Sequence, residues 1–210
     1  MANICSTDIT LRGPKEELDR IYSALEAVMK SDDHWSARLL IESGLYKTID
    51  EMSEDHLYVR GSISNLDYTD DNTISVSQED NWSPQLDGIK LVCEALAPNV
   101  EIVYKAEEPG CGFAKTNSDD IVGDYFVDVW EPENLSGSLS GFCWDQVTED
   151  NLRDALLEYL GFESSDKDTE SLIALAQQES DYAFVAFQYQ YCALEDLTHS
   201  LRSLGRKTAD

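Results

Sequence analysis

Two adjacent glutamates beside a glycine-rich turn are the residues of this chain best suited to chemistry. The turn runs from Glu107 through Pro109 to Phe113, and Trp82 stands about twenty residues before Tyr104. Paired carboxylates can do acid–base work when burial separates their pKa values, and a tryptophan can supply a stacking wall. This interpretation predicts a small-molecule or metal-binding site with hydrolytic potential. Its candidate binding residues are Trp82, Tyr104, Glu107, Glu108, Gly110, Cys111 and Phe113.

The same turn has a structural interpretation, which we favour. Pro109 and the glycines would form a tight turn whose positive-φ positions require glycine, while Phe113 and Trp82 would close the edge of the core. A reactive thiolate at Cys111 would need a positive neighbourhood, and the nearby glutamates provide the opposite. We therefore expect no catalytic residue in this segment.

No other segment carries a recognised catalytic or metal-binding pattern. The three histidines, His34, His56 and His199, lie far apart, and the sequence contains no HExxH, GxSxG, GxGxxG or phosphate-binding-loop motif. The acidic runs do not follow the spacing of a calcium-binding loop, so we interpret them as solvated turns. These runs are Asp32-Asp33-His34, Asp70-Asp71-Asn72, Glu79-Asp80 and Asp119-Asp120. The sequence therefore predicts neither a metal nor a cofactor.

Charge is the most unusual property of the composition. The 210 residues include 42 Asp and Glu against 15 Lys and Arg, which gives a formal net charge of −27. Such a charge favours solubility and repels phosphate backbones, so it argues against direct binding to nucleic acid or to an anionic membrane. Without a catalytic pattern, the charge favours a non-enzymatic protein-interaction module with a basic partner, and a DNA-binding protein is one candidate for that partner. The alternative is that the charge serves solubility alone.

Cysteine usage and hydropathy predict a soluble protein of the reducing cytoplasm. The five cysteines are scattered and odd in number, and no two of them form a CxxC pair. The first residues lack the basic and apolar regions of a signal peptide. No apolar run reaches the roughly eighteen residues that a membrane span requires.

Hydrophobic periodicity predicts an α+β fold for residues 1–130. The order is strand, helix, strand, strand, helix, strand, followed by one more strand. This order is typical of a ferredoxin-like antiparallel sheet with helices on one face. Residues 31–56 look like an insertion, with a short helix closed by Gly44. The predicted elements are strands Ile4–Leu11, Leu57–Ser64, Thr73–Ser77, Val100–Lys105 and Gly123–Trp130, helix Pro14–Lys30, a second helix capped by Ser83 and ended by Pro98, and a polar hairpin loop at 67–72.

Residues 131–210 are predicted to form a helical-plus-strand extension packed on this core. The strand at Tyr182–Tyr191 carries aromatic side chains on both faces, which suits either a buried strand or an interface. We favour the buried position. The predicted helices are Thr148–Leu160 with Gly161 as its C-terminal cap, Asp168–Gln178 and Leu194–Leu204.

Three segments carry a family resemblance. The opening Met1-Ala2-Asn3-Ile4-Cys5 through Gly13, the run Asn81-Trp82-Ser83-Pro84, and Tyr104 with Glu107-Glu108-Pro109-Gly110-Cys111-Gly112-Phe113-Ala114 resemble a first strand, a second-helix entry and a signature turn. The three features that these segments resemble belong to the Api92-like / YubB-type family, which consists of uncharacterised bacterial, phage and plasmid proteins. The resemblance covers about residues 1–130 except 31–56, and it is specific in 82–113. It implies a ferredoxin-like domain and no established activity.

Overall fold

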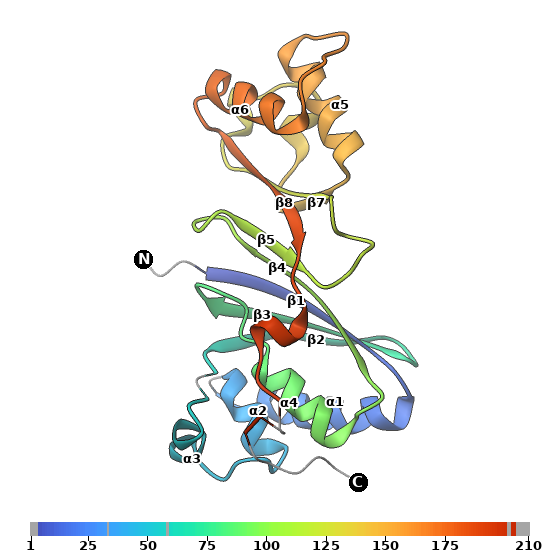
Figure 1. The fold of residues 1–210 in the computed structure, drawn as a ribbon, viewed down its shortest axis with the longest axis vertical. Coiled ribbons are helices and arrows are strands. Elements are labelled where there is room, and N and C mark those ends of the chain that lie inside the picture. Colours follow the sequence, from blue (N-terminus) through green and yellow to red (C-terminus); the bar gives the residue numbers. More distant parts are fainter. Residues whose placement is uncertain (1–3, 33, 58, 201–202, 205–210) are drawn as a thin grey trace. The chain divides into compact units, whose positions relative to one another are not determined.

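The computed structural model describes residues 4–32, 34–57, 59–200 and 203–204 (Figure 1). They form two compact units. The first unit draws its described residues from 1–111, 116–118 and 192–210, and the second comprises 112–115 and 119–191. Both units combine helices with strands, so the predicted α+β class is confirmed. None of the described helices is both long and apolar enough to cross a lipid bilayer.

The first unit contains an antiparallel sheet with one buried face. Alternate residues of its first strand are buried, as expected when helices cover one side of a sheet. These residues are Cys5, Thr7, Ile9 and Leu11. The strands are β1 (Ile4–Arg12), β2 (Gly61–Asp70), β3 (Thr73–Asn81) and β4 (Glu101–Glu108), in the order β2-β3-β1-β4.

Helices α1 (Lys15–Met29) and α4 (Asp87–Leu96) pack against each other on one side of this sheet (Figure 1). The predicted first helix is thereby confirmed, with Pro14 as the extended residue before it. Its apolar side chains recur every three or four residues, and burying them is what fixes the helix on the sheet. The fully buried members of this stripe are Leu18, Ile21, Leu25 and Val28.

The predicted start of the second long helix is wrong. Ser83 does not cap it, and the helix begins at Asp87. The reason is that the backbone N–H of Gln85 donates to the carboxylate of Asp80 (3.0 Å), which holds the preceding segment in a non-helical turn. Trp82 lies in this turn with a φ of +70°, a conformation that a helix cannot contain.

The hairpin of β2 and β3 also differs from its prediction. Strand β2 begins at Gly61 rather than Leu57 and continues through most of the predicted polar loop, leaving a turn at Asp71-Asn72. The extension is explained by Tyr68, whose ring stacks on Tyr22 of α1 with 4.7 Å between the centroids. This aromatic contact packs the extended part of β2 against α1.

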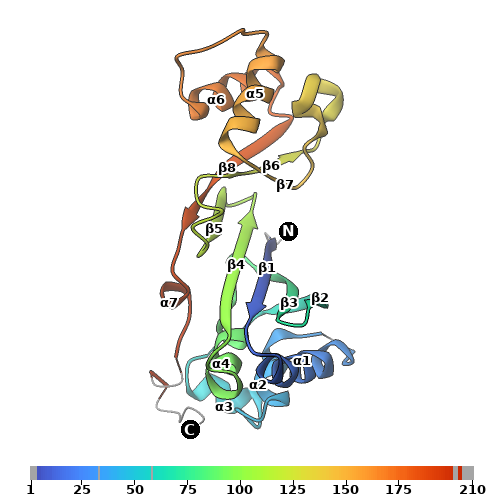
Figure 2. The ribbon, with the colours of Figure 1, turned by 90° about the vertical axis from the view of Figure 1, so that its right-hand side faces the viewer.

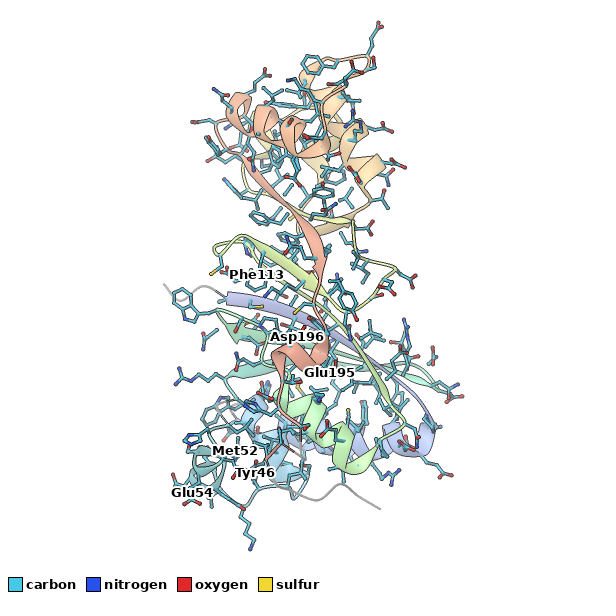
Figure 3. All side chains as sticks on the ribbon, viewed as in Figure 1. Tyr46, Met52, Glu54, Phe113, Glu195 and Asp196 are labelled. Carbon is cyan, nitrogen blue, oxygen red and sulfur yellow. The ribbon has the colours of Figure 1, made fainter. Side chains whose placement is uncertain are left out.

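The insertion holds two short helices, α2 (Ser36–Glu42) and α3 (Ile49–Glu54). The predicted short helix closed by Gly44 is confirmed, since Gly44 follows α2 with a φ of +78°. The second short helix was not predicted. The insertion contributes to the core, because Tyr46 and Met52 (Figure 3) are each only 2% exposed.

The second unit combines helices and strands around a core of its own. Its helices α5 (Glu149–Leu160) and α6 (Thr169–Glu179) pack against each other (Figure 2). The short 3-10 helices η1 (Pro132–Asn134) and η2 (Gly137–Gly141) precede them. Its strands are β6 (Tyr125–Val129), β7 (Asp145–Val147), β8 (Phe184–Tyr191) and residues 113–115 of β5 (Phe113–Thr116), in the order β5-β8-β6-β7. The core includes Tyr125, Val127, Leu139, Leu152, Leu156, Leu172, Ile173 and Phe184.

Helices α5 and α6 each begin one residue after the predicted start, because Thr148 and Asp168 are their N-cap residues. The side chain of Thr148 accepts the N–H of Asn151 and that of Asp168 accepts the N–H of Ser171, so both helices start with a satisfied donor. Gly161 ends α5 in the left-handed region at a φ of +69°, as predicted. These local signals fix both helices almost independently of the rest of the fold.

The last two predicted elements are confirmed only in part. In β8, Phe184 and Tyr189 are buried, which supports the predicted core position, whereas Tyr191 at its end is 56% exposed. The closing helix predicted for Leu194–Leu204 is only one turn long, α7 (Leu194–Leu197), and its residues 201–202 lie outside the described part of the chain. The helix ends before Thr198, whose backbone is extended with a φ of −137°.

Candidate functional site

The two glutamates of the predicted site point to opposite sides of β4. Glu107 pairs with Ser6 of β1, on the side away from the helices, whereas Glu108 is on the helix side. The carboxylate of Glu108 accepts the backbone N–H of Cys111 and so closes the turn after the strand. Both glutamates are buried. The turn therefore uses Glu108 as a structural acceptor, and the two carboxylates do not form a pair.

The remaining predicted site residues take up separate positions. Tyr104 is buried, and its hydroxyl donates to the backbone oxygen of Cys192 (2.8 Å), which ties β4 to the C-terminal segment of the first unit. Trp82 is 56% exposed at the end of β3. Gly110 and Cys111 are exposed in the turn, and Phe113 begins β5 in the second unit (Figure 3).

A buried polar network lies where β3 leads into α4, and sequence reasoning missed it. Its centre is Asp80, whose carboxylate accepts Thr7 Oγ1 (3.1 Å), Gln78 Nε2 (2.6 Å) and the N–H of Gln85 (3.0 Å). Asp80 is only 2% exposed. Because its donors come from β1, β3 and the following turn, this one carboxylate joins three segments of the first unit.

Burial dominates the acid–base properties of this region. It raises the pKa of Asp80 from 3.8 to about 7, despite the three donors that favour the charged form. It also raises the pKa of the Cys5 thiol to about 12, and the charges of Asp80, Glu107 and Glu108 act in the same direction. A thiol in such surroundings is not nucleophilic near neutral pH, so Cys5 is a packing residue.

The cysteines give a direct test of this assignment. Cys111 and Cys143 are exposed and should react rapidly with a thiol reagent in the folded protein, whereas Cys5 and Cys93 should react only after denaturation. The reason is that burial raises the pKa of both hidden thiols to about 12. We expect a fast phase of two thiols in a time course with 5,5′-dithiobis(2-nitrobenzoic acid), with the partly buried Cys192 reacting in a separate, slower phase. Cys111→Ser and Cys143→Ser should each remove half of the fast phase, and a fast phase that survives both changes would contradict the assignment.

A groove in the second unit combines an apolar floor with acidic edges. It lies between η2, β7 and α5 and has a volume of about 480 Å³, within the usual range of ligand pockets. Phe142, Val147 and Ala155 supply the apolar surface. Its charged lining residues are Asp145, Asp154 and Glu158, and no Lys, Arg or His is among the lining residues.

Two of these carboxylates are held in place by the surrounding backbone. Glu158 accepts both the N–H (3.1 Å) and the hydroxyl (2.9 Å) of Ser138 in η2, and these bonds keep the pKa of Glu158 below its ordinary value. Asp145 accepts the N–H of Cys143 (3.0 Å). The groove therefore presents fixed negative charge at neutral pH, and it is suited to a cationic side chain.

Metal binding has no support in the described part of the chain. No three His, Cys, Asp or Glu side chains of these residues are grouped so that they could hold a metal ion. Comparisons of the chain with protein-family models, curated proteins and solved structures found no match.

Proposed function

We propose that this protein is a non-enzymatic interaction module whose second unit engages a basic protein partner. The observation that carries the proposal is the charge of this unit. It contains 17 Asp and Glu against three Lys and Arg, and 15 of the 17 acidic residues are exposed. A surface of one sign attracts a partner of the opposite sign and suppresses wrong partners.

Exposed aromatic residues in the same unit support the proposal. Trp130, Trp144 and Tyr182 are 49%, 48% and 62% exposed, although side chains of this size bury a large apolar area when they are covered. Tryptophan and tyrosine are enriched among the residues that dominate binding energy at protein interfaces. Acidic charge would thus guide the partner to the unit, and aromatic anchors would hold it.

The hydrolytic alternative lacks its central requirement. Acid–base hydrolysis by two carboxylates needs both groups to reach the same substrate atoms. Glu107 and Glu108 are adjacent on a strand and lie on its opposite sides, and the Glu108 carboxylate is engaged by the turn. An interaction module accounts for the structure without such a site.

For the fold, we propose that the first unit has ferredoxin-like topology. The antiparallel order β2-β3-β1-β4, with α1 and α4 as the two long connections, supports this. We also propose kinship with the Api92-like / YubB-type family, and this proposal rests on the sequence resemblance in residues 82–113.

The proposal is tested by neutralising charge in one unit at a time. A second-unit variant carries Asp120→Asn, Glu133→Gln, Asp150→Asn and Glu163→Gln. A matched first-unit variant carries Asp32→Asn, Asp50→Asn, Glu54→Gln and Glu79→Gln. All eight residues are exposed, and both variants change the net charge by the same amount. Each is used as bait in nuclease-treated lysate of the native organism, and retained proteins are eluted with rising salt and identified.

We expect the wild type and the first-unit variant to retain the same Lys- and Arg-rich protein, released at higher salt than from the second-unit variant. The purified partner should then bind the wild type with an affinity that falls as salt rises. Displacement by duplex DNA would identify a partner that itself binds DNA. Equal elution from both variants would contradict the role of the second unit.

A further inference from the structure

We propose that the groove between β7 and α5 binds an arginine side chain of the basic partner. This inference rests on the proposed function, because it names the part of the partner that the second unit recognises. The groove offers two matching features, a negative edge and an apolar floor. An arginine side chain has the complementary arrangement, with a charged planar end and an aliphatic stem.

The carboxylates favour a guanidinium group as the occupant. Asp145 projects from β7, whereas Asp154 and Glu158 lie four residues apart on one side of α5. A guanidinium group has five N–H donors in a fixed plane, so it can bond to more than one carboxylate at once. An ammonium group is more strongly hydrated and loses more on leaving water. Three separate acceptors therefore match arginine better than lysine.

The floor of the groove favours the same occupant. Val147 and Ala155 are buried beneath it, and Phe142 is partly exposed at its side. The methylene stem of an arginine can cover aliphatic surface while its charged end stays at the edge. A guanidinium plane can also stack on the ring of Phe142, an interaction that a neutral side chain would not gain.

Among the residues that the structure describes, no basic side chain lines this groove. The two carboxylates with backbone donors, Asp145 and Glu158, are already oriented. Asp154 is exposed on α5 and faces the same groove. A cationic side chain from outside would thus meet preoriented acceptors, which reduces the ordering that binding requires.

The test uses the full chain, labelled with ¹⁵N, and three blocked peptides of the form Gly-Gly-X-Gly-Gly. X is arginine, lysine or citrulline, the last being a neutral analogue of arginine. We expect the arginine peptide to shift the amide signals of Gln146, Asn151 and Ala155 at low salt. The lysine peptide should bind more weakly, and the citrulline peptide should cause no shift. Asp154→Asn and Asp145→Asn should each lower the affinity for the arginine peptide by about tenfold, because each removes one charge-assisted contact.

Asp166→Asn is the matched control, because it changes the net charge equally at an exposed residue outside the groove. Equal weakening by Asp166→Asn and Asp154→Asn, equal binding of the arginine and citrulline peptides, or preferred binding of lysine would each overturn the proposal. The neutralising variants that test the proposed function leave the groove residues unchanged. Equal elution of the partner from both variants in that test, with peptide binding intact, would overturn the proposed function alone. The expected difference in elution without binding of the arginine peptide would overturn the groove alone.

Discussion

Alanine in place of Asp80 is expected to lower the free energy of unfolding by about 3 kcal/mol near pH 5, because the donors around this carboxyl group would be left without an acceptor in the core. Thr7 Oγ1, Gln78 Nε2 and the N–H of Gln85 all donate to it. Each buried donor that loses its acceptor costs about 1–3 kcal/mol. Urea unfolding followed by circular dichroism gives the difference.

Asp80 should also make stability depend on pH. Burial raises its pKa from 3.8 to about 7, so between these values the folded chain keeps a proton that the unfolded chain releases. The contribution of Asp80 to the free energy of unfolding therefore falls as the pH rises from about 4 to about 7, by at most about 4 kcal/mol, and is constant above that range. The penalty of Asp80→Ala should shrink accordingly between pH 5 and pH 8.

Asp80→Asn is the control that keeps the shape and removes the titration. As the pH rises from about 4 to about 7, the free energy of unfolding of the wild type should fall relative to that of Asp80→Asn. Carboxylates with a lowered pKa, such as Glu17 and Asp168, act in the opposite direction near pH 4, but they are common to both proteins and cancel. A difference that stays constant from pH 5 to pH 8 would mean that Asp80 is ionised throughout.

Elements with local signals could be predicted from the sequence. The apolar spacing of α1 and the caps Thr148, Asp168 and Gly161 involve residues within a few positions of each other. The signal for each of these helices therefore lies within or beside the helix itself. The start of α4 could not be predicted in this way. Ser83 and Pro84 form a plausible helix entry, but a more distant carboxylate, Asp80, fixes the backbone into another turn.

The predicted pairing of Glu107 with Glu108 depended on where strand β4 ends. Ending the strand at Lys105 placed Glu107 and Glu108 in a loop, where neighbouring side chains can converge. Strand β4 in fact continues to Glu108, and the alternation of a strand sends the two carboxylates to opposite sides. An error of three residues at the end of the strand thus changed the chemistry that the turn could perform.

The groove could have been predicted from the sequence in part, whereas the network around Asp80 could not. Asp150, Asp154 and Glu158 recur every four residues in a helix that was predicted, so an acidic stripe on α5 was available as a signal. The surroundings of Asp80 were not, because Thr7, Gly61 and Gln85 approach it from three other segments. Only the folded chain brings them together.

Gly61→Ala is expected to destabilise the first unit by about 3 kcal/mol, because the space beside this residue is already filled. A Cβ atom at Gly61 would lie 2.0 Å from Asp80 Oδ1, 3.0 Å from the backbone oxygen of Glu79 and 3.1 Å from Ser36 Oγ. The carboxyl group of Asp80 would have to move, and it cannot do so without breaking its hydrogen bonds. Gly141→Ala is the control, since a Cβ there meets nothing within 4 Å.

The effects of Asp80→Ala and Gly61→Ala on the free energy of unfolding should not add. Measuring both together separates a clash with Asp80 from a general intolerance of side chains at residue 61. In an Asp80→Ala background the 2.0 Å contact disappears, and only the contacts with Glu79 and Ser36 remain. We therefore expect Gly61→Ala to cost about 1 kcal/mol in that background, a coupling of about 2 kcal/mol between residues in direct contact. Equal penalties in both backgrounds would place the strain on the backbone of Glu79. A smaller penalty in the variant background would make Asp80 the reason why β2 must carry glycine at this position.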